Sequence, residues 1–212
     1  MNTTTTQYHQ LYTAWHKLNH VLFGGSLPLP LLTISNPAGN KRTEAYFHGG
    51  VWMSGEKTRD EIALIRRYMG ADSERAILCS MAHEMCHQWQ YHFGKPSRNG
   101  YHNQQWADKM AEIGLESIGL NAEGEPTGKM TGQNASHKLL QGGMLSSVVG
   151  GMLMDGWKMP LAWCGGDGKK AIPAARKATK YVCVGCGMAL SGKPDLSVIC
   201  GDCRILMSAE IL

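Results

Sequence analysis

The residues with the most evident chemistry lie in the stretch HEMCH, residues 83–87, where two histidines stand four positions apart. Residues i and i+4 of an α-helix share one face, so His83 and His87 can direct both imidazoles at one metal ion. Glu84 follows the first histidine and would stand beside that ion, where a carboxylate can take a proton from an activated water molecule. The spacing therefore predicts a metal centre with its own general base.

A third protein ligand is needed, because a catalytic zinc usually has three and keeps one position for water. We expect His102 to be this ligand, since the loop at residues 94–100 lets the chain turn back and present it at the start of the next helix. Glu112 and Glu116 on that helix are the alternative carboxylate ligands. His92 lies about 140° around its helix from the second ligand and is predicted to point away.

Two other interpretations of this cluster stay open. One is a helix that lines the core and whose histidines are only hydrogen-bonded, which is the usual state of a single buried histidine. Three histidines in this arrangement, together with the glutamate, favour the metal. The other interpretation is a site that binds zinc without catalysing a reaction. Histidine-rich sites accept several divalent ions, among which zinc is favoured.

A second candidate metal site closes the chain in two CxxC pairs. Its four thiols belong to Cys183, Cys186, Cys200 and Cys203. Four thiolates complete a tetrahedral zinc and leave no open position, so this zinc is predicted to be structural. A redox-active CxxC pair is the alternative, which two pairs at this spacing disfavour. The predicted cofactors are therefore two zinc ions, one catalytic and one structural.

The composition is that of a globular protein, with 43% hydrophobic and 18% charged residues among 212. No segment approaches the ~20 apolar residues needed to span a bilayer, and the first ten residues lack the basic and apolar regions of a secretory signal. We therefore expect a cytoplasmic protein without a membrane partner. In that reducing compartment its seven cysteines are expected to be thiols or metal ligands.

The net charge of +4 arises from an excess of lysine and arginine in residues 156–212. A basic C-terminal module favours an anionic partner such as DNA, single-stranded DNA included, although a solvated surface is an equal alternative. The residues that combine positive charge with an aromatic ring are Arg176, Lys177, Lys180 and Tyr181. They are the candidates for holding phosphate and stacking on a base. Alternatively, Tyr181 only packs the cysteine module.

Hydrophobic periodicity outlines the elements that must position these residues. It predicts an opening helix (residues 4–22), three short strands (31–35, 45–53 and 61–65), a helix that carries HEMCH (73–93) and a further helix begun by His102. Residues 121–155 are glycine-rich and weakly periodic, which indicates an irregular connector, with packing on the main domain as an open alternative. We expect a main domain at residues 1–120, a connector and basic linker at 121–178, and a compact cysteine module at 179–212.

The order of HEMCHQWQ, a loop with Gly, Pro and Arg, GYH, and a Trp four residues after that histidine resembles the SprT/Spartan-type family. LFGGSLP, GGVW and EIAL resemble its upstream half, so the resemblance covers about residues 8–120. It implies a minimal zincin-like α/β (α+β) metalloprotease domain in which His83, His87 and His102 bind the catalytic zinc and Glu84 is the base. The cysteine module is similar to the C-terminal zinc ribbon of that family.

The resemblance also implies protein substrates at or crosslinked to DNA, and hence a role in DNA–protein crosslink repair. TGKMTGQNASH and QGGM are similar to the connector of phage-type relatives, for which no role follows. Asn103 stands where many members have glycine, which puts the loop that presents His102 in doubt. Tyr91 and Tyr101 are the candidates for stabilising the oxyanion.

Three functions are therefore compared. The first is a zinc metallopeptidase that acts on proteins at DNA. The second is a nucleic-acid-binding regulator that keeps the zincin-like domain as a scaffold without proteolysis. The third is a hydrolase of small amides or cell-wall peptides, for which a basic module would have no evident purpose.

Overall fold

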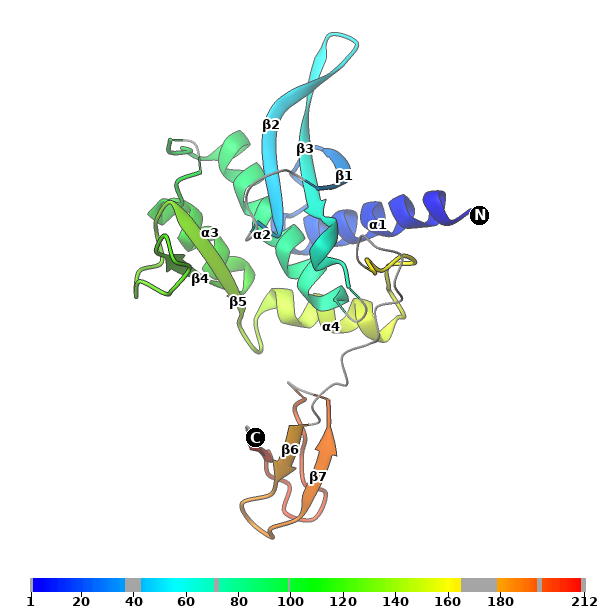
Figure 1. The fold of residues 1–212 in the computed structure, drawn as a ribbon, viewed down its shortest axis with the longest axis vertical. Helices are drawn as coiled ribbons and strands as arrows, with labels where there is room; N and C mark the ends of the chain where they lie inside the picture. Colours follow the sequence, from blue (N-terminus) through cyan, green and yellow to red (C-terminus); the bar gives the residue numbers. More distant parts are fainter. Residues whose placement is uncertain are drawn as a thin grey trace. The chain divides into compact units, whose positions relative to one another are not determined.

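The computed structural model describes residues 2–36, 43–70, 73–98, 100–164, 179–193 and 196–210 (Figure 1). The chain divides into two compact units, which we call the main unit (residues 1–164) and the ribbon unit (residues 165–212). Within the described residues, no helix has both the length and the apolar character that crossing a membrane requires.

The main unit combines helices with two small sheets. Its elements are α1 (Thr3–Phe23), β1 (Leu31–Ser35), β2 (Ala45–Ser54), β3 (Lys57–Ile65), the 3-10 helix η1 (Arg66–Tyr68), α2 (Glu74–Phe93), α3 (Gln104–Ile113), β4 (Leu115–Leu120), β5 (Asn134–Leu139) and α4 (Met144–Met154). This mixed architecture confirms the predicted α/β fold class.

The first sheet has the order β1-β3-β2, with β1 parallel and β2 antiparallel to the central strand β3. Residues 60–65 of β3 are buried at six consecutive positions, as expected for a strand that is paired on both edges and covered on both faces. The tip of the β2–β3 hairpin extends past the helices (Figure 1). The register of this hairpin shifts between His48 and Trp52, which marks a bulge in β2.

Helix α2 runs through the centre of the main unit and is buried on nearly all sides. It contacts β2, β3, α1, α3 and α4. The largest apolar side chains that it buries are Ile77, Leu78, Met81 and Met85. A helix enclosed in this way has little freedom to move, so side chains on its surface are held in fixed positions.

The segment expected to be an irregular connector is ordered and belongs to the main unit. Strand β5 pairs antiparallel with β4, and α4 packs against α1 and α2. Helix α4 buries Leu145, Val148, Val149 and Met152, which follow the i, i+3, i+4, i+7 spacing of a helix face. Gly150 and Gly151 interrupt this short pattern, which is why it reads as weakly periodic.

The main unit also extends further along the chain than the predicted boundary at residue 120. Trp157 is buried, and its indole N–H donates a hydrogen bond of 3.1 Å to the carbonyl of Gln10 in α1. The backbone N–H of Leu161 donates to the side chain of Gln7, at 3.1 Å. Residues 121–164 are thus tied to the first helix of the chain.

The ribbon unit consists of β6 (Thr179–Val182), β7 (Ala189–Gly192) and β8 (Ser208–Glu210), in the order β7-β6-β8. All of its pairings are antiparallel. Its buried core is small and comprises Tyr181, Cys183, Cys200 and Met207.

Candidate metal centre

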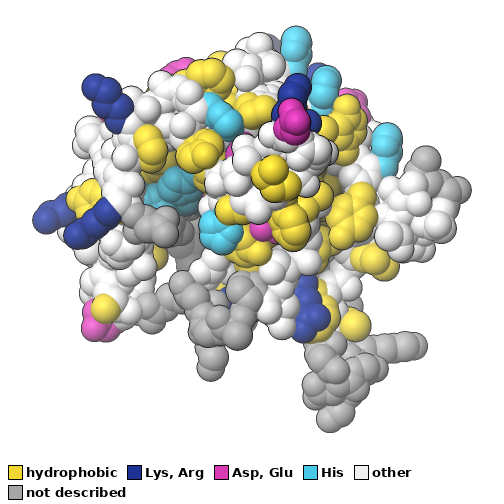
Figure 2. Space-filling model, turned by 90° about the horizontal axis from the view of Figure 1, so that it is seen from above, with side chains coloured by type: hydrophobic (Ala, Val, Ile, Leu, Met, Phe, Trp, Pro, Cys, Tyr) yellow, Lys and Arg dark blue, Asp and Glu magenta, His cyan; other side chains and the backbone are white. Residues whose placement is uncertain are grey.

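Three histidines from two elements meet on one side of α2. His83 and His87 lie one turn apart on α2, and His102 precedes α3. Each offers one ring nitrogen such that the three nitrogens lie within 4.8 Å of one another. The ring centroids are 5.2 Å apart for His83 and His87 and 4.9 Å apart for His87 and His102. A group of histidine side chains lies in a hollow of the surface shown in Figure 2.

Asn103 holds the turn that presents His102. Its side-chain oxygen accepts from the backbone N–H of Trp106, at 3.0 Å, and thereby caps α3. The same oxygen accepts from Gln90 of α2, at 2.7 Å, and the amide nitrogen donates to the carbonyl of Lys95, at 3.1 Å. Asn103 has an ordinary φ of −86°, so the position does not require glycine. The asparagine therefore braces the loop between the second and third candidate ligands.

Trp106 forms a wall behind the three histidines. It is fully buried, and its ring lies 4.8 Å from His83, 4.9 Å from His87 and 4.4 Å from His102, measured between centroids. Its plane is inclined by only 20° to that of His87, so these two rings are stacked. The tryptophan thus packs against every candidate ligand and restricts how each ring can turn.

Two of the histidines also have a partner on their other ring nitrogen. Nδ1 of His83 lies 3.1 Å from Nδ1 of His137 in β5. Nδ1 of His102 lies 3.2 Å from the carbonyl oxygen of Gly132, and the backbones of these two residues also form a mutual bridge. In both histidines Nε2 is then left as the ligating atom. Gly132 and His137 were not singled out from the sequence, because only the bridge of Gly132 to His102 and the pairing of β4 with β5 bring them here.

Burial keeps the histidines neutral. Loss of solvent, together with the smaller effect of the charge of His102, lowers the pKa of His87 to about 3. Burial likewise lowers the pKa of His83 well below its ordinary value. For His102 burial also lowers the pKa, while the hydrogen bond to Gly132 acts in the opposite direction. A neutral imidazole has the free lone pair that a metal ion requires.

Glu84 is buried beside this group, with one carboxylate oxygen 3.9 Å from Nε2 of His83. Burial raises the pKa of Glu84 to about 8, the negative charge of Glu44 contributes in the same direction, and a hydrogen bond from the backbone of Phe47 opposes both. A cation held by the three histidines would favour the charged carboxylate.

Three neutral imidazoles with a carboxylate alongside are compatible with zinc, which accepts three nitrogen ligands and an open fourth position in catalytic sites.

A model of the SprT-like family matches residues 11–125, more than half of the chain. The chain belongs to the SprT-like family. The match confirms the resemblance seen in the sequence and supports a metallopeptidase-type domain. It includes the three histidines and Glu84, whereas Gly132, His137 and the ribbon unit of this SprT-like protein lie beyond its end. Searches of curated proteins and of solved structures found no match.

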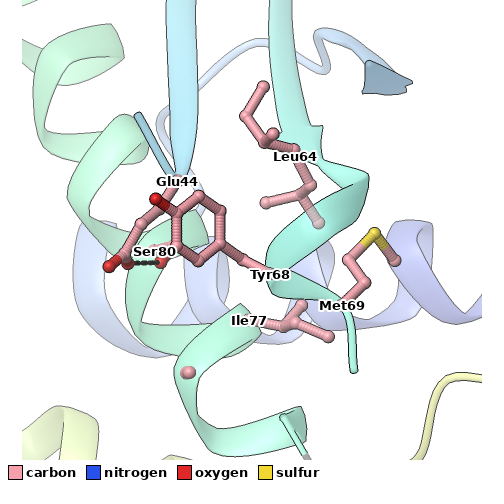
Figure 3. Close-up of a pocket in the computed structure, with 8 residues that line it drawn as sticks. Glu44, Leu64, Tyr68, Met69, Ile77 and Ser80 are labelled. Atoms are coloured by element: carbon pink, nitrogen blue, oxygen red, sulfur yellow. Dashed lines mark hydrogen bonds between the residues drawn. The ribbon is translucent and has the colours of Figure 1, made fainter. Parts of the chain in front are cut away.

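This SprT-like main unit also contains a small pocket. Its volume is about 70 Å³, and it is lined by Glu44, Leu64, Ile65, Tyr68, Met69, Ala76, Ile77 and Ser80. Figure 3 shows Glu44 hydrogen-bonded to Ser80, whose hydroxyl donates at 2.9 Å. The walls are otherwise mostly apolar. Glu44 therefore lines this pocket and also contributes to the raised pKa of Glu84.

The other polar candidates near HEMCH each have a partner outside the three histidines. His92 lies 2.7 Å from the buried carboxylate of Asp60, measured from Nε2 to Oδ2, and so points to β3 as expected. Tyr91 packs against the β2 bulge, where a Cβ added to Gly49 would lie 2.6 Å from its ring. The ring of Tyr101 faces Arg98, whose guanidinium carbon is 5.2 Å from its centroid. A role of either tyrosine at the oxyanion stays a prediction.

The ribbon unit brings its four cysteines together. Their sulfurs lie within 4.8 Å of one another. The backbone N–H of Cys186 stabilises the thiolate of Cys183 and lowers its pKa to about 7. Hydrogen bonding to Cys186 raises the pKa of Cys203 to about 12, as expected where several negatively charged thiolates would lie close together. Such a group is compatible with a tetrathiolate zinc.

The structure corrects the prediction for Tyr181. Its side chain is 1% exposed, its hydroxyl donates to the carbonyl of Lys193 at 2.7 Å, and it accepts from the backbone N–H of Leu196 at 2.9 Å. A ring enclosed in this way packs the ribbon and offers no face to a base. Lys180 is exposed. Arg176 and Lys177 lie outside the described residues.

Proposed function

We propose that this protein is a zinc-dependent metallopeptidase that cleaves proteins bound or crosslinked to DNA. The observation that carries the hydrolytic part is the convergence of three neutral, largely enclosed histidines beside the carboxylate of Glu84 in a chain of the SprT-like family. His83, His87 and His102 would hold the metal. When bound, zinc supplies a Lewis acid that polarises the scissile carbonyl and makes water more acidic.

Glu84 would move the proton of the reaction. It takes a proton from the attacking water and later gives it to the nitrogen of the leaving amine. Burial suits it to this task, because a carboxyl group whose pKa is raised towards neutrality can both accept and return a proton. The backbone N–H of Phe47 orients the carboxylate, and the wall formed by Trp106 shields the site from bulk water.

The DNA-associated substrate is supported by charge and by family resemblance. The excess of lysine and arginine falls in the last quarter of the chain, and a basic module suits an anionic partner. The positive charges of Lys180, Arg176 and Lys177 would contact phosphates. Tyr181 is not part of this interface, since it is buried.

The test compares wild type with Glu84→Gln in the cleavage of a DNA-bound protein, with and without single-stranded DNA, and measures zinc content in parallel. We expect two zinc ions per chain in both proteins and cleavage that DNA stimulates in wild type. In Glu84→Gln cleavage should fall by roughly 10²–10⁴-fold, the usual contribution of a general base. The matched control is Glu116→Gln, which changes an exposed carboxylate on β4 and should cleave normally.

Other outcomes would redirect the proposal. Two zinc ions with DNA binding but no cleavage by wild type would favour the alternative function, a non-proteolytic nucleic-acid-binding regulator. One zinc ion per chain would contradict the assignment of the three histidines. Cleavage of small amides that DNA does not affect, and that survives removal of residues 169–212, would favour a hydrolase unrelated to DNA.

A further inference from the structure

Strand β5 delivers a fourth histidine to the metal centre. His137 pairs directly with Ser117 of β4, and residues paired across an antiparallel ladder point to the same face. That face of β4 is the buried one, because Leu115 and Ser117 are buried while Glu116 between them is exposed. The pairing of β4 with β5 thus turns His137 inwards, towards His83 on α2.

The hydrogen bond between the two rings defines which nitrogen carries each proton. The two Nδ1 atoms are 3.1 Å apart, so one must donate and the other must accept. If His83 binds the metal through Nε2, its proton is on Nδ1 and it is the donor. His137 then accepts at Nδ1 and carries its own proton on Nε2.

We propose that His137 is a positioning residue of the metal centre, which fixes the ring and the tautomer of His83 by accepting a hydrogen bond from its Nδ1. The carbonyl of Gly132 does the same for His102, at 3.2 Å. Metal-binding histidines generally donate their other N–H to such a partner, which orients the ring and increases its basicity. The inference rests on the metal centre of the proposed function and not on its substrate.

This assigns a role to residues 131–139, for which the sequence suggested none. The hairpin of β4 and β5 supplies a partner to two of the three candidate ligands, and it does so from beyond the segment that the family model matches. The alternative is that His137 is itself a fourth ligand, which would close the site. Among the described residues, the group of nitrogens within 4.8 Å of one another contains His83, His87 and His102 but not His137.

The test is zinc affinity of the histidine site, measured on the full chain by competition with a chelator, with ribbon zinc measured separately. His137→Leu and His137→Asn form a matched pair, because the two side chains have nearly the same shape and only asparagine places an acceptor oxygen where Nδ1 was. We expect His137→Leu to bind zinc about 10–100-fold more weakly than wild type, and His137→Asn to stay within a few-fold of it. Lys138→Gln, on the exposed face of β5, should bind normally.

Two outcomes would overturn the inference. Wild-type affinity in His137→Leu would show that the contact does not position His83. Equal, severe losses in both variants would make His137 a ligand, because asparagine cannot replace an imidazole at zinc. Should His137→Leu fail to fold, His137→Gln takes its place, since its acceptor is displaced by one bond and the same loss is expected. Zinc affinity is read without any substrate, so the inference can hold where proteolysis at DNA is not found, and the reverse.

Discussion

The two candidate zinc sites of this protein are built on opposite principles. The histidine centre lies on a helix that a large core encloses, and Trp106 packs against all three rings. In the ribbon unit, by contrast, two of the four cysteines, Cys183 and Cys200, make up half of the small buried core, and Tyr181 and Met207 are the other half. The core of the main unit exists without a metal, whereas the ribbon has little else to hold it together.

This difference predicts which site needs zinc in order to fold, and it gives the largest expected effect. Stripping both metals with a strong chelator should unfold the ribbon unit, because structural zinc contributes on the order of 10 kcal/mol to folding in such modules. The main unit should keep its fold. Amide signals in a heteronuclear NMR spectrum report on both units at once.

The control for this experiment is Cys200→Ser, which removes one buried thiolate and leaves the histidines intact. It should reproduce the loss of ribbon signals even with zinc present, with the main-unit signals unchanged. Unfolding of the main unit on chelation would show that the histidine centre is structural as well, and would remove the contrast between the two sites.

Acid should decrease the free energy of unfolding of the main unit, which carries the histidine centre, by a few kcal/mol. In the metal-free main unit, burial holds the pKa of His87 at about 3 against an ordinary 6.5. Between these values the unfolded chain binds a proton that the folded chain does not, so the free energy of unfolding decreases as pH falls. The slope is about 1.4 kcal/mol per pH unit for each such histidine. Urea titrations at pH 6.5 and 5 measure this slope. His87→Gln should reduce it by the share of one histidine, whereas His16→Gln, on the exposed face of α1, should leave it unchanged.

Because of Glu84, the free energy of unfolding of the metal-free main unit should also decrease on the alkaline side. Its pKa is about 8 in the folded chain and 4.5 as an ordinary value, so the folded state holds an extra proton between them. Above about pH 7, where the histidines of the unfolded chain are mostly deprotonated, stability should decrease by about 1 kcal/mol towards pH 8. Maximum stability of the metal-free main unit is therefore expected near pH 7. Glu84→Gln should remove the alkaline decline alone; a decline that persists would have another origin.

How far the sites could be predicted from the sequence follows from the range of the interactions that build them. HEMCH depends on the geometry of one helical turn, and the CxxC pairs depend on a turn each, so both are visible as spacing. His102 required only a short loop to be closed. His137 depends on the register of β4 with β5, and Gly132 depends on an isolated bridge to His102. No local pattern in the sequence predicts either pairing.

Tyr181 shows a different limit. An aromatic residue beside lysines fits both a base-stacking surface and the core of a small module, and composition does not separate these two uses. The structure decides, because Tyr181 lies in the central strand of the ribbon sheet with its hydroxyl bonded on both sides. Burial, rather than residue type, removes it from the proposed DNA contact.

The smallest expected effect concerns a difference between the two CxxC turns of the ribbon, which we call its knuckles. In the first, Gly187 donates to the carbonyl of Cys183 at 2.8 Å; in the second, Arg204 donates to Cys200 at the same distance. Both residues have a left-handed φ, 73° and 56°, and Arg204 is the one non-glycine residue with positive φ among those the structure describes. A side chain in this conformation costs about 1 kcal/mol, which glycine avoids.

Arg204→Gly should therefore stabilise the ribbon, by about 1 kcal/mol at most, and tighten its zinc by up to roughly fivefold. Gly187→Ala places the same strain on the first knuckle and should weaken zinc by a similar factor. Chelator competition at the cysteine site measures both. Arg204 is exposed, so little contact is lost with its side chain. A weaker ribbon in Arg204→Gly would mean that the arginine makes a contact worth more than the strain, and the two knuckles would then differ in more than one residue's conformation.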